Sequence, residues 1–205
     1  RKRSQMVRQR TTNLLSIQNL LTRNTGSSMK ASRVKGLDVQ QVDELLPNED
    51  LALAVKANLA VLSSADEQVE LLEQTVTQRV KLRPQFSFLK TVPGIGEILA
   101  LTIMLETGDI RRFLSVGNYA SYCRCVGSQK ISNGKKKGKG NTKNGNKYLS
   151  WAFVEAAHFA IRFNSKIKSF YQRKKAKTKV VVAIKAVAHK LCRACYYIMR
   201  DRVAF

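Results

Sequence analysis

Acidic side chains are scarce in this chain of 205 residues, in which 14 Asp and Glu stand against 37 Lys and Arg. The formal net charge of +23 is far beyond what solubility requires, and it predicts a polyanionic partner, with nucleic acid as the first candidate. Long apolar runs are also lacking: the longest, residues 98–105 and 180–184, are much too short to cross a membrane, and no cleavable signal precedes them. We expect a cytoplasmic protein without membrane contact.

Proline and cysteine are sparse too. None of the three prolines follows Pro93, which favours a mostly helical second half. The four cysteines form two pairs, Cys123/Cys125 and Cys192/Cys195. A spacing of one residue is poor for zinc, and the second pair lies within an apolar helical stripe, so we expect buried thiols and assign no metal ligand here. Disulfides are not expected in an intracellular protein.

The charge is unevenly distributed. Residues 1–109 hold 14 basic and 12 acidic side chains, whereas residues 110–205 hold 23 basic and only two acidic ones, Glu155 and Asp201. The second part is therefore predicted to lie against phosphates, with an affinity that falls as salt rises. A merely solvated basic surface is the alternative, but two carboxylates leave most of these cations unpaired. The same scarcity argues against a two-metal nuclease centre in this part.

Two long helices are predicted in the first part. Apolar residues three, four or seven apart indicate a helix over residues 4–23, and a loop with a short helix near residues 39–46 follows it. Residues 51–76 then repeat apolar side chains every seven positions, at Val55, Leu62, Val69 and Val76. This heptad seam predicts packing against the first helix and a dimerising coiled coil, two compatible roles that the sequence does not separate.

A glycine-rich turn lies between two apolar segments at residues 89–103. Gly94 and Gly96 flank Ile95 directly after Pro93. Glycines allow a tight turn and let main-chain N–H groups at the start of the next helix approach a phosphate. The pattern resembles the helix-hairpin-helix motif of DNA-binding proteins. Packing is the alternative role, and we expect phosphate contact.

Residues 127–147 contain five glycines and seven lysines. This composition rules out a regular helix and predicts a mobile cationic loop that fits itself to a nucleic-acid backbone. A hydroxyl nucleophile in such a loop would have cations beside its transition state, and chemistry alone leaves Ser132 and Ser128 as equal candidates. Helices are predicted again from Lys147 onward, with a basic run at residues 162–179. The aromatic residues there are expected in the core more often than in base stacking: Tyr148, Trp151, Phe170 and Tyr171.

Three stretches in order carry a more specific pattern: VPGIGEILALTIMLETGDIRRF, NYASYCRCVGSQKISNGKKK and NTKNGNKYLSWAFVEAAHFAI. They resemble the C-terminal transposase domain of the insertion-sequence 110 family, which is related to Piv-type DNA invertases. The similarity covers about residues 86–200. It implies a mainly α fold, with the last helix of a RuvC-like domain and a coiled-coil segment in residues 1–83, and a helical transposase domain with a helix-hairpin-helix motif in residues 84–205.

The resemblance also implies a function. The protein would be a transposase or site-specific recombinase that breaks and rejoins donor and target double-stranded DNA in the bacterial nucleoid, directed by a structured guide RNA. A homo-oligomer, dimer or tetramer, would form through the coiled coil. Mg²⁺ would bind an Asp/Glu tetrad in a RuvC-like domain preceding Arg1, so we expect these residues to be the C-terminal part of a longer transposase.

The same resemblance places the nucleophilic serine at Ser132, which would attack a DNA phosphate. The family's Ser-Ser-Gly-Gly loop reads Ile131-Ser132-Asn133-Gly134 here. Ser150 stands where the family usually has an arginine, and Lys147 would supply the phosphate contact of that arginine. The residues expected to contact nucleic acid are Gly94, Ile95, Gly96, Lys130, Lys135, Lys136, Lys137, Lys139, Lys143, Asn146, Lys147, Arg173, Lys174 and Lys175. The alternatives are a binding module without catalysis and, ranked last, a basic structural RNA-binding protein.

Overall fold

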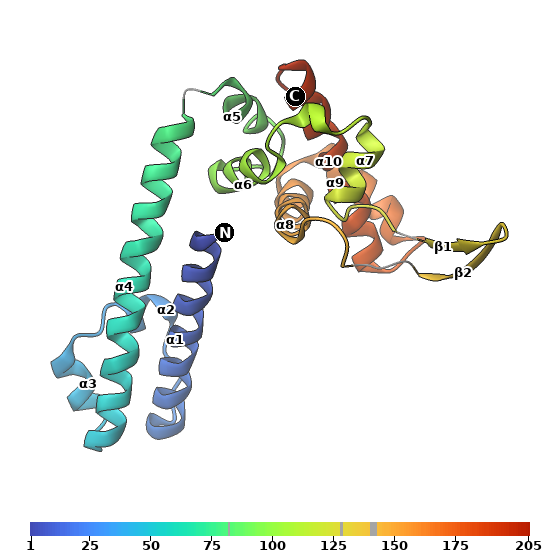
Figure 1. The fold of residues 1–205 in the computed structure, drawn as a ribbon. Helices are drawn as coiled ribbons and strands as arrows, with labels where there is room; N and C mark the ends of the chain where they lie inside the picture. Colours follow the sequence, from blue (N-terminus) through green and yellow to red (C-terminus); the bar gives the residue numbers. More distant parts are fainter. Residues whose placement is uncertain (82, 128, 140–142) are drawn as a thin grey trace. The chain divides into compact units, whose positions relative to one another are not determined.

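The computed structural model describes residues 1–81, 83–127, 129–139 and 143–205. The chain is mainly α, as the sequence predicts, and it divides into two compact units, Arg1–Val76 and Thr77–Phe205 (Figure 1). The boundary falls inside a long helix and precedes the one expected after residue 83. Among the described helices, none has both the length and the hydropathy that a membrane crossing needs.

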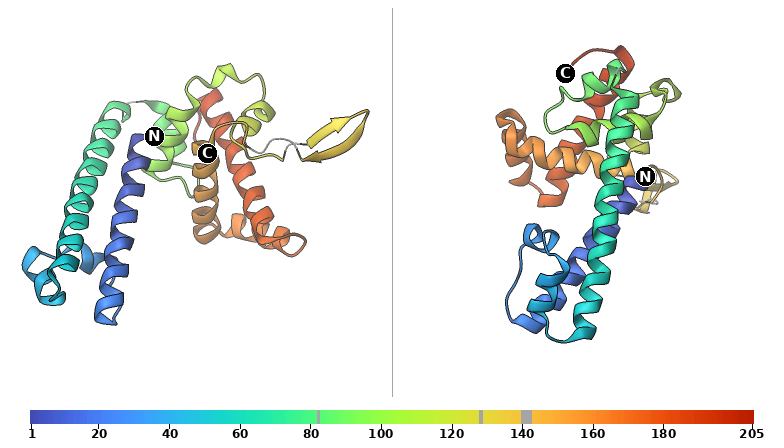
Figure 2. Two further views of the ribbon diagram at one scale, coloured as in Figure 1. Left: turned by 60° about the horizontal axis from the view of Figure 1, so that its bottom comes forward. Right: turned by 90° about the vertical axis from the view of Figure 1, so that its left-hand side faces the viewer.

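The first unit is built from four helices. α1 (Lys2–Thr25) ends at Gly26, whose φ of 71° is the left-handed conformation that closes many helices. α2 (Ala31–Lys35) was not predicted, whereas α3 (Val39–Leu45) was, and Asp38 caps α3 by accepting a hydrogen bond from the Gln41 main-chain N–H. α4 (Glu49–Val80) follows and runs alongside α1 in both views of Figure 2.

The heptad seam of α4 is buried within this unit. Val55 is 0% exposed, Leu62 3% and Val69 4%, and Val55 shares a core cluster with Ile17 and Leu21 of α1. Ion pairs add to this packing, since Asp66 of α4 contacts both Arg10 at 2.7 Å and Lys35 at 2.6 Å. Of the two roles predicted for the seam, packing against the first helix is the one that the structure shows.

A second apolar stripe of α4 is exposed. Leu53 is 67% exposed, Val61 50% and Leu71 56%. At 3.6 residues per turn Leu53 and Leu71 lie on the side of the helix opposite to Val55 and Val69, and Val61 lies on the flank between the two sides. The exposed stripe, defined by Leu53, Val61 and Leu71, is therefore a surface on which the first unit has unburied apolar area.

The second unit packs helices around α10 (Val180–Asp201), which contacts α5 (Pro84–Leu89), α7 (Val116–Tyr122), α8 (Lys147–Phe163) and α9 (Ser165–Lys175). α6 (Glu97–Thr107) packs against α5 and α8, and a single 3₁₀ turn, η1 (Ile110–Arg112), follows it. The fully buried side chains at the centre of this unit include Leu89, Tyr119, Leu149, Phe153 and Val187.

The expectation that four aromatics belong to the core was wrong. Tyr148, Trp151, Phe170 and Tyr171 are exposed or half-buried, with Trp151 at 41%. The buried face of α8 is instead formed by Leu149, Ala152, Phe153, Ala156, Ala157 and Ala160. Small residues predominate there because neighbouring helices approach α8 closely.

The cationic segment after α7 differs from the mobile loop that was predicted. It forms a two-stranded antiparallel hairpin, β1 (Gln129–Ser132) and β2 (Lys135–Lys139). Asn133 and Gly134 join the strands with φ of 50° and 68°, the paired left-handed values of a type I′ turn, which Asn-Gly favours. The Asn-Gly dipeptide is a sequence signal for a hairpin, and the prediction of a loop did not use it. The hairpin extends away from the helices of the second unit (Figures 1 and 2).

Candidate nucleic-acid interface

Ser132 lies at the tip of the hairpin. It is the last residue of β1 and pairs with Lys135 across the Asn133-Gly134 turn. Its side chain is exposed, and no carboxylate or imidazole forms a hydrogen bond with its hydroxyl in the described part of the chain. The tight turn thus presents an exposed hydroxyl near the tip of a cationic hairpin.

Lysines surround this hydroxyl along the hairpin. Lys135 and Lys137 are exposed, and Lys137 is the extra residue of a bulge, because Ile131 pairs with Lys136 and Lys130 with Gly138. Lys143 and Lys147 are exposed beyond β2. Lys130, Lys136 and Lys139 lie in the strands, but their side chains, like Ser128 as a whole, fall outside the described part of the chain.

The two ends of the hairpin segment are tied together at its base. Arg124, in a left-handed conformation with φ of 55°, donates hydrogen bonds to the carbonyl oxygens of Lys143 and Gly145. Gly145 has a φ of +94°, and a Cβ at this position would lie 2.5 Å from the Tyr122 carbonyl oxygen. Only glycine fits there, so the Gly145 in the family-like motif has a structural reason.

Asn146 completes this base. Its Oδ1 accepts hydrogen bonds from the main-chain N–H groups of Tyr148 and Leu149, which caps α8, and its Nδ2 donates to Glu106 at 2.7 Å and to the Tyr122 hydroxyl at 3.4 Å. The amide is 7% exposed, and all of its hydrogen-bonding positions are used within the chain. The structure thus gives Asn146 a positioning role, and its predicted contact with nucleic acid stays a prediction.

Tyr122 has an unusual electrostatic environment at the same base. Hydrogen bonds from Asn146 and from the Arg112 guanidinium hold the pKa of its hydroxyl below the ordinary value. Arg112 also lies over the rings of Phe113 and Tyr122, at 4.6 and 4.7 Å from their centroids. Sequence reasoning missed Glu106, Tyr122 and Arg124, because only the fold brings them to the hairpin.

The Gly94-Ile95-Gly96 turn lies between α5 and α6. Ile95 is buried and Gly96, exposed, precedes the first residue of α6. Gly94, with φ of +84°, faces the main chain of α8, where a Cβ would collide with the Ala156 carbonyl oxygen and lie 2.6 Å from the Ala160 nitrogen. Gly94 therefore serves packing, while phosphate contact at this turn stays a prediction.

Arg173, Lys174 and Lys175 occupy the last turn of α9, all exposed. The predicted binding residues therefore form three groups in the second unit: the hairpin with its base, the turn before α6, and the end of α9. The structure brings Ser132 close to the lysines of the hairpin. It shows no contact between the Ser132 hydroxyl and the turn before α6 or the end of α9.

The cysteines are free thiols that gather between the end of α7 and α10. Cys123, Cys192 and Cys195 are buried, as predicted, and Cys125 is half-buried. Burial raises the pKa of Cys192 and Cys195 well above the ordinary value for a thiol. Over the described residues, no three His, Cys, Asp or Glu side chains are arranged to hold a metal ion.

Comparison with known proteins finds similarity to one family over part of the chain. Residues 87–172 match the model of the Transposase IS116/IS110/IS902 family. The chain is 23% identical over 152 residues to the insertion element IS110 uncharacterized 43.6 kDa protein of Streptomyces coelicolor, covering 74% of this chain and 38% of that protein. It is 20% identical over 180 residues to the insertion element IS116 uncharacterized 44.8 kDa protein of Streptomyces clavuligerus, covering 87% of this chain and 45% of that protein.

The chain spans less than half the length of these two curated relatives. The family match covers α6, η1, α7, the hairpin, α8 and most of α9, which is the part of the second unit that carries Ser132 and the hairpin base. Residues 87–172 are thus similar to the Transposase IS116/IS110/IS902 family, and two insertion-element proteins of Streptomyces are weakly similar over most of this chain.

Proposed function

We propose that this chain forms the DNA-joining part of a transposase, in which Ser132 attacks a phosphate of double-stranded DNA. The observation that carries the proposal is the position of Ser132: an exposed hydroxyl at the tip of a lysine-rich hairpin whose base is tied to α7 and α8. A hydroxyl at a projecting tip can meet a phosphate while the helices stay clear of the duplex.

The chemistry is a transfer of the phosphodiester to serine. A bond forms between Ser132 Oγ and phosphorus, and the bond from phosphorus to one deoxyribose oxygen breaks. The serine proton leaves to a base, and the released deoxyribose oxygen takes up a proton. A hydroxyl of a second strand then attacks the phosphoserine, which rejoins DNA and restores the serine. Lys135 and Lys137 place positive charge beside the phosphorus, where negative charge accumulates in the transition state.

The described part of residues 110–205 does not fit a magnesium site. Residues 110–205 contain two carboxylates; Glu155 lies within α8 and Asp201 is paired with Arg200 at 2.6 Å. The Mg²⁺ expected from the family resemblance therefore belongs, in this proposal, to a RuvC-like domain, and no step here depends on it. The base that accepts the serine proton is likewise supplied from outside the hairpin.

A guide RNA and a homo-oligomer complete the proposal. The basic end of α9 is a second cationic segment besides the hairpin, so RNA and DNA can occupy separate surfaces. The exposed stripe of α4 offers the oligomer contact, since the heptad seam is already buried against α1. Apolar area of this kind on a long helix is typical of helix pairing.

The test is a covalent trap on a denaturing gel. The protein is mixed with labelled DNA, the element's RNA and Mg²⁺, and Ser132→Ala is compared with Ser128→Ala and Ser27→Ala. We expect a heat-stable protein–DNA adduct in the wild type and in both control variants, and none in Ser132→Ala, which still binds DNA. Adduct formation by Ser132→Ala would refute the assignment. Tight DNA binding without adduct in any form would favour the binding module without catalysis.

A further inference from the structure

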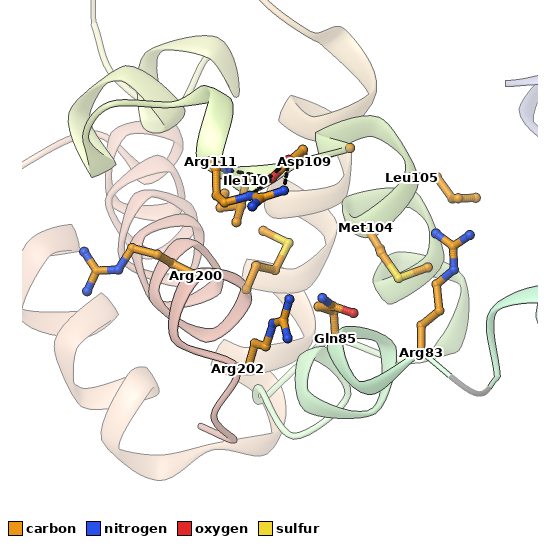
Figure 3. A pocket seen from close by; sticks show the side chains of 11 residues that line it. Arg83, Gln85, Met104, Leu105, Asp109, Ile110, Arg111, Arg200 and Arg202 are labelled. Atoms are coloured by element: carbon orange, nitrogen blue, oxygen red, sulfur yellow. Dashed lines mark hydrogen bonds and ion pairs between the residues drawn. The ribbon is translucent and has the colours of Figure 1, made fainter.

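A cavity of about 480 Å³ lies in the second unit away from the hairpin, where the end of α10 meets α5, α6 and η1. Four arginines line it: Arg83, Arg111, Arg200 and Arg202. They come from three segments of the chain, and Figure 3 shows the guanidinium groups of Arg111, Arg83 and Arg202 on different sides of one hollow. We refer to it as the arginine cavity; its volume is in the range of small-molecule sites.

The charge of the arginine cavity is only partly balanced. Asp109 binds Arg111 through hydrogen bonds to the Arg111 main chain and guanidinium, including one of 2.8 Å to Nη2, and Arg200 is paired with Asp201. Arg83 and Arg202 form no ion pair with another described residue. Two positive charges therefore remain for an anionic ligand.

Asp109 orients Arg111 without consuming all of its donors. The carboxylate engages Nε and Nη2, and a guanidinium has five N–H groups, so the remaining ones are free to bind an oxyanion. The Arg111 guanidinium holds the pKa of Asp109 at about 2, so the carboxylate stays charged, and Arg111 stays oriented, throughout the neutral range.

Between the arginines the lining is apolar. Leu105, at 51% exposure, forms this part of the arginine cavity together with Met104 and Met199, which are 7% and 4% exposed. Thioether and aliphatic groups contact aromatic rings favourably, and Gln85 adds an amide that can donate and accept hydrogen bonds. A phosphate alone would use the arginines and leave the apolar lining without a partner.

We propose that the arginine cavity binds one unpaired nucleotide of a nucleic-acid strand, with the phosphate on Arg83, Arg111 and Arg202 and the base against Met104, Leu105 and Met199. The inference rests on the proposed function, since strand exchange and a guide RNA both supply unpaired nucleotides. A paired base has its faces covered by its neighbours in the stack, so a duplex would offer only its phosphates to this site.

The test is a comparison of binding by fluorescence anisotropy. Short oligothymidine and oligouridine distinguish DNA from RNA as the source of the nucleotide, and a duplex of equal length measures general phosphate binding. Arg83→Gln/Arg202→Gln is compared with Arg8→Gln/Arg23→Gln, which removes two exposed charges from α1. We expect the first pair to weaken single-strand binding about tenfold more than the control pair, because two charge-assisted phosphate contacts are lost. Duplex binding should be weakened less than single-strand binding, because a paired base adds no contact at this site.

A third variant and a cross-linking experiment test the site in case the arginine double variant fails to fold. Leu105→Glu places a carboxylate at the arginine cavity without changing an arginine, and we expect it to weaken single-strand binding by a similar factor. A strand carrying 4-thiothymidine should cross-link under light to peptides containing Met104 and Leu105 or Met199.

The inference would be overturned if both arginine double variants weakened single-strand binding equally, or if the cross-links were confined to other peptides. The proposed function would still stand in that case, provided that the wild type binds the duplex. A free mononucleotide that competes with the labelled strand as strongly as an unlabelled strand does would also overturn the inference. That result would indicate a site for free nucleotides. If the wild type binds neither duplex nor single strand, the proposed function fails as well.

Discussion

Gly94 faces the main chain of Ala160 so closely that a Cβ on Gly94 would lie 2.6 Å from the Ala160 nitrogen. This contact joins the turn between α5 and α6 to the middle of α8. Two residues further on, Gly96 has open space around its Cα and an extended conformation with φ of −84°. The two glycines of one motif therefore have different physical roles.

The Gly94→Ala substitution should destabilise the protein by about 2–4 kcal/mol, because the methyl group overpacks the contact with α8 and the left-handed conformation adds strain. Gly96→Ala, in open space, should cost no more than about 1 kcal/mol. Urea unfolding followed by circular dichroism measures both free energies of unfolding. Equal losses for the two variants would contradict the packing role of Gly94.

The type I′ turn should control the reactivity of Ser132. Gly134→Ala keeps the serine and every lysine but puts a Cβ at a φ of 68°, which costs roughly 1–2 kcal/mol and favours open forms of the hairpin. We expect weaker cross-strand nuclear Overhauser effects between Ile131 and Lys136, and less adduct at unchanged DNA affinity. Gly127→Ala, outside the strands, serves as control; full adduct formation by Gly134→Ala would show that the turn does not matter.

Asn146 should stabilise the hairpin base. Asn146→Ala removes the cap of α8 and leaves Glu106 without its amide partner, at a cost of about 1–3 kcal/mol. Asn164→Ala, which removes the cap of α9 alone, should cost about 1 kcal/mol. Thermal and urea unfolding distinguish the two values, and a smaller loss at Asn146 than at Asn164 would contradict a role beyond capping.

The same substitution has a pH signature. Because the pKa of Tyr122 is lowered by Asn146 and Arg112, whereas burial raises that of Tyr119, Tyr122 should ionise first in an absorbance titration. Asn146→Ala should move the Tyr122 pKa up. A phenol whose pKa is lowered by folding gains stability from this source only at alkaline pH, and the gain is lost as the pH falls through the folded-state pKa. Stability near neutral pH should therefore be independent of Tyr122 ionisation.

The exposed stripe of α4 should hold the oligomer together. Leu53→Glu/Leu71→Glu puts charges on this apolar surface, so analytical ultracentrifugation should show dissociation toward monomers. Ser63→Glu/Gln74→Glu adds the same charges at exposed positions on another side of α4 and should leave the assembly unchanged. If the wild type and both variants sediment identically, the exposed stripe is not the oligomer contact.

Much of the helical architecture could be predicted from local pattern. The periods of apolar residues predicted α1, α4, α8 and α10 because each helix buries one side, whatever covers it. The charge partition predicted the basic character of residues 110–205, where two carboxylates stand against 23 cations, and phosphate binding there stays a prediction. The hairpin was missed because its strands lack apolar alternation, although Asn133-Gly134 is a strong local turn signal.

The remaining features depend on contacts between distant segments. Spacing placed Tyr148 and Trp151 on one side of a helix, but only the packing of α8 decided that they stay outside the core. Asn146 could be assigned to a motif, yet its bonds to Glu106 and Tyr122 come from the fold. The sequence by itself determined the helices, the basic character of the second part and Ser132 as the candidate nucleophile, because these follow from local periodicity, charge and motif. Tertiary structure alone decided which glycine packs, what ties the hairpin base and how Arg83 and Arg202 come to share one cavity, because such contacts join residues that no local pattern relates.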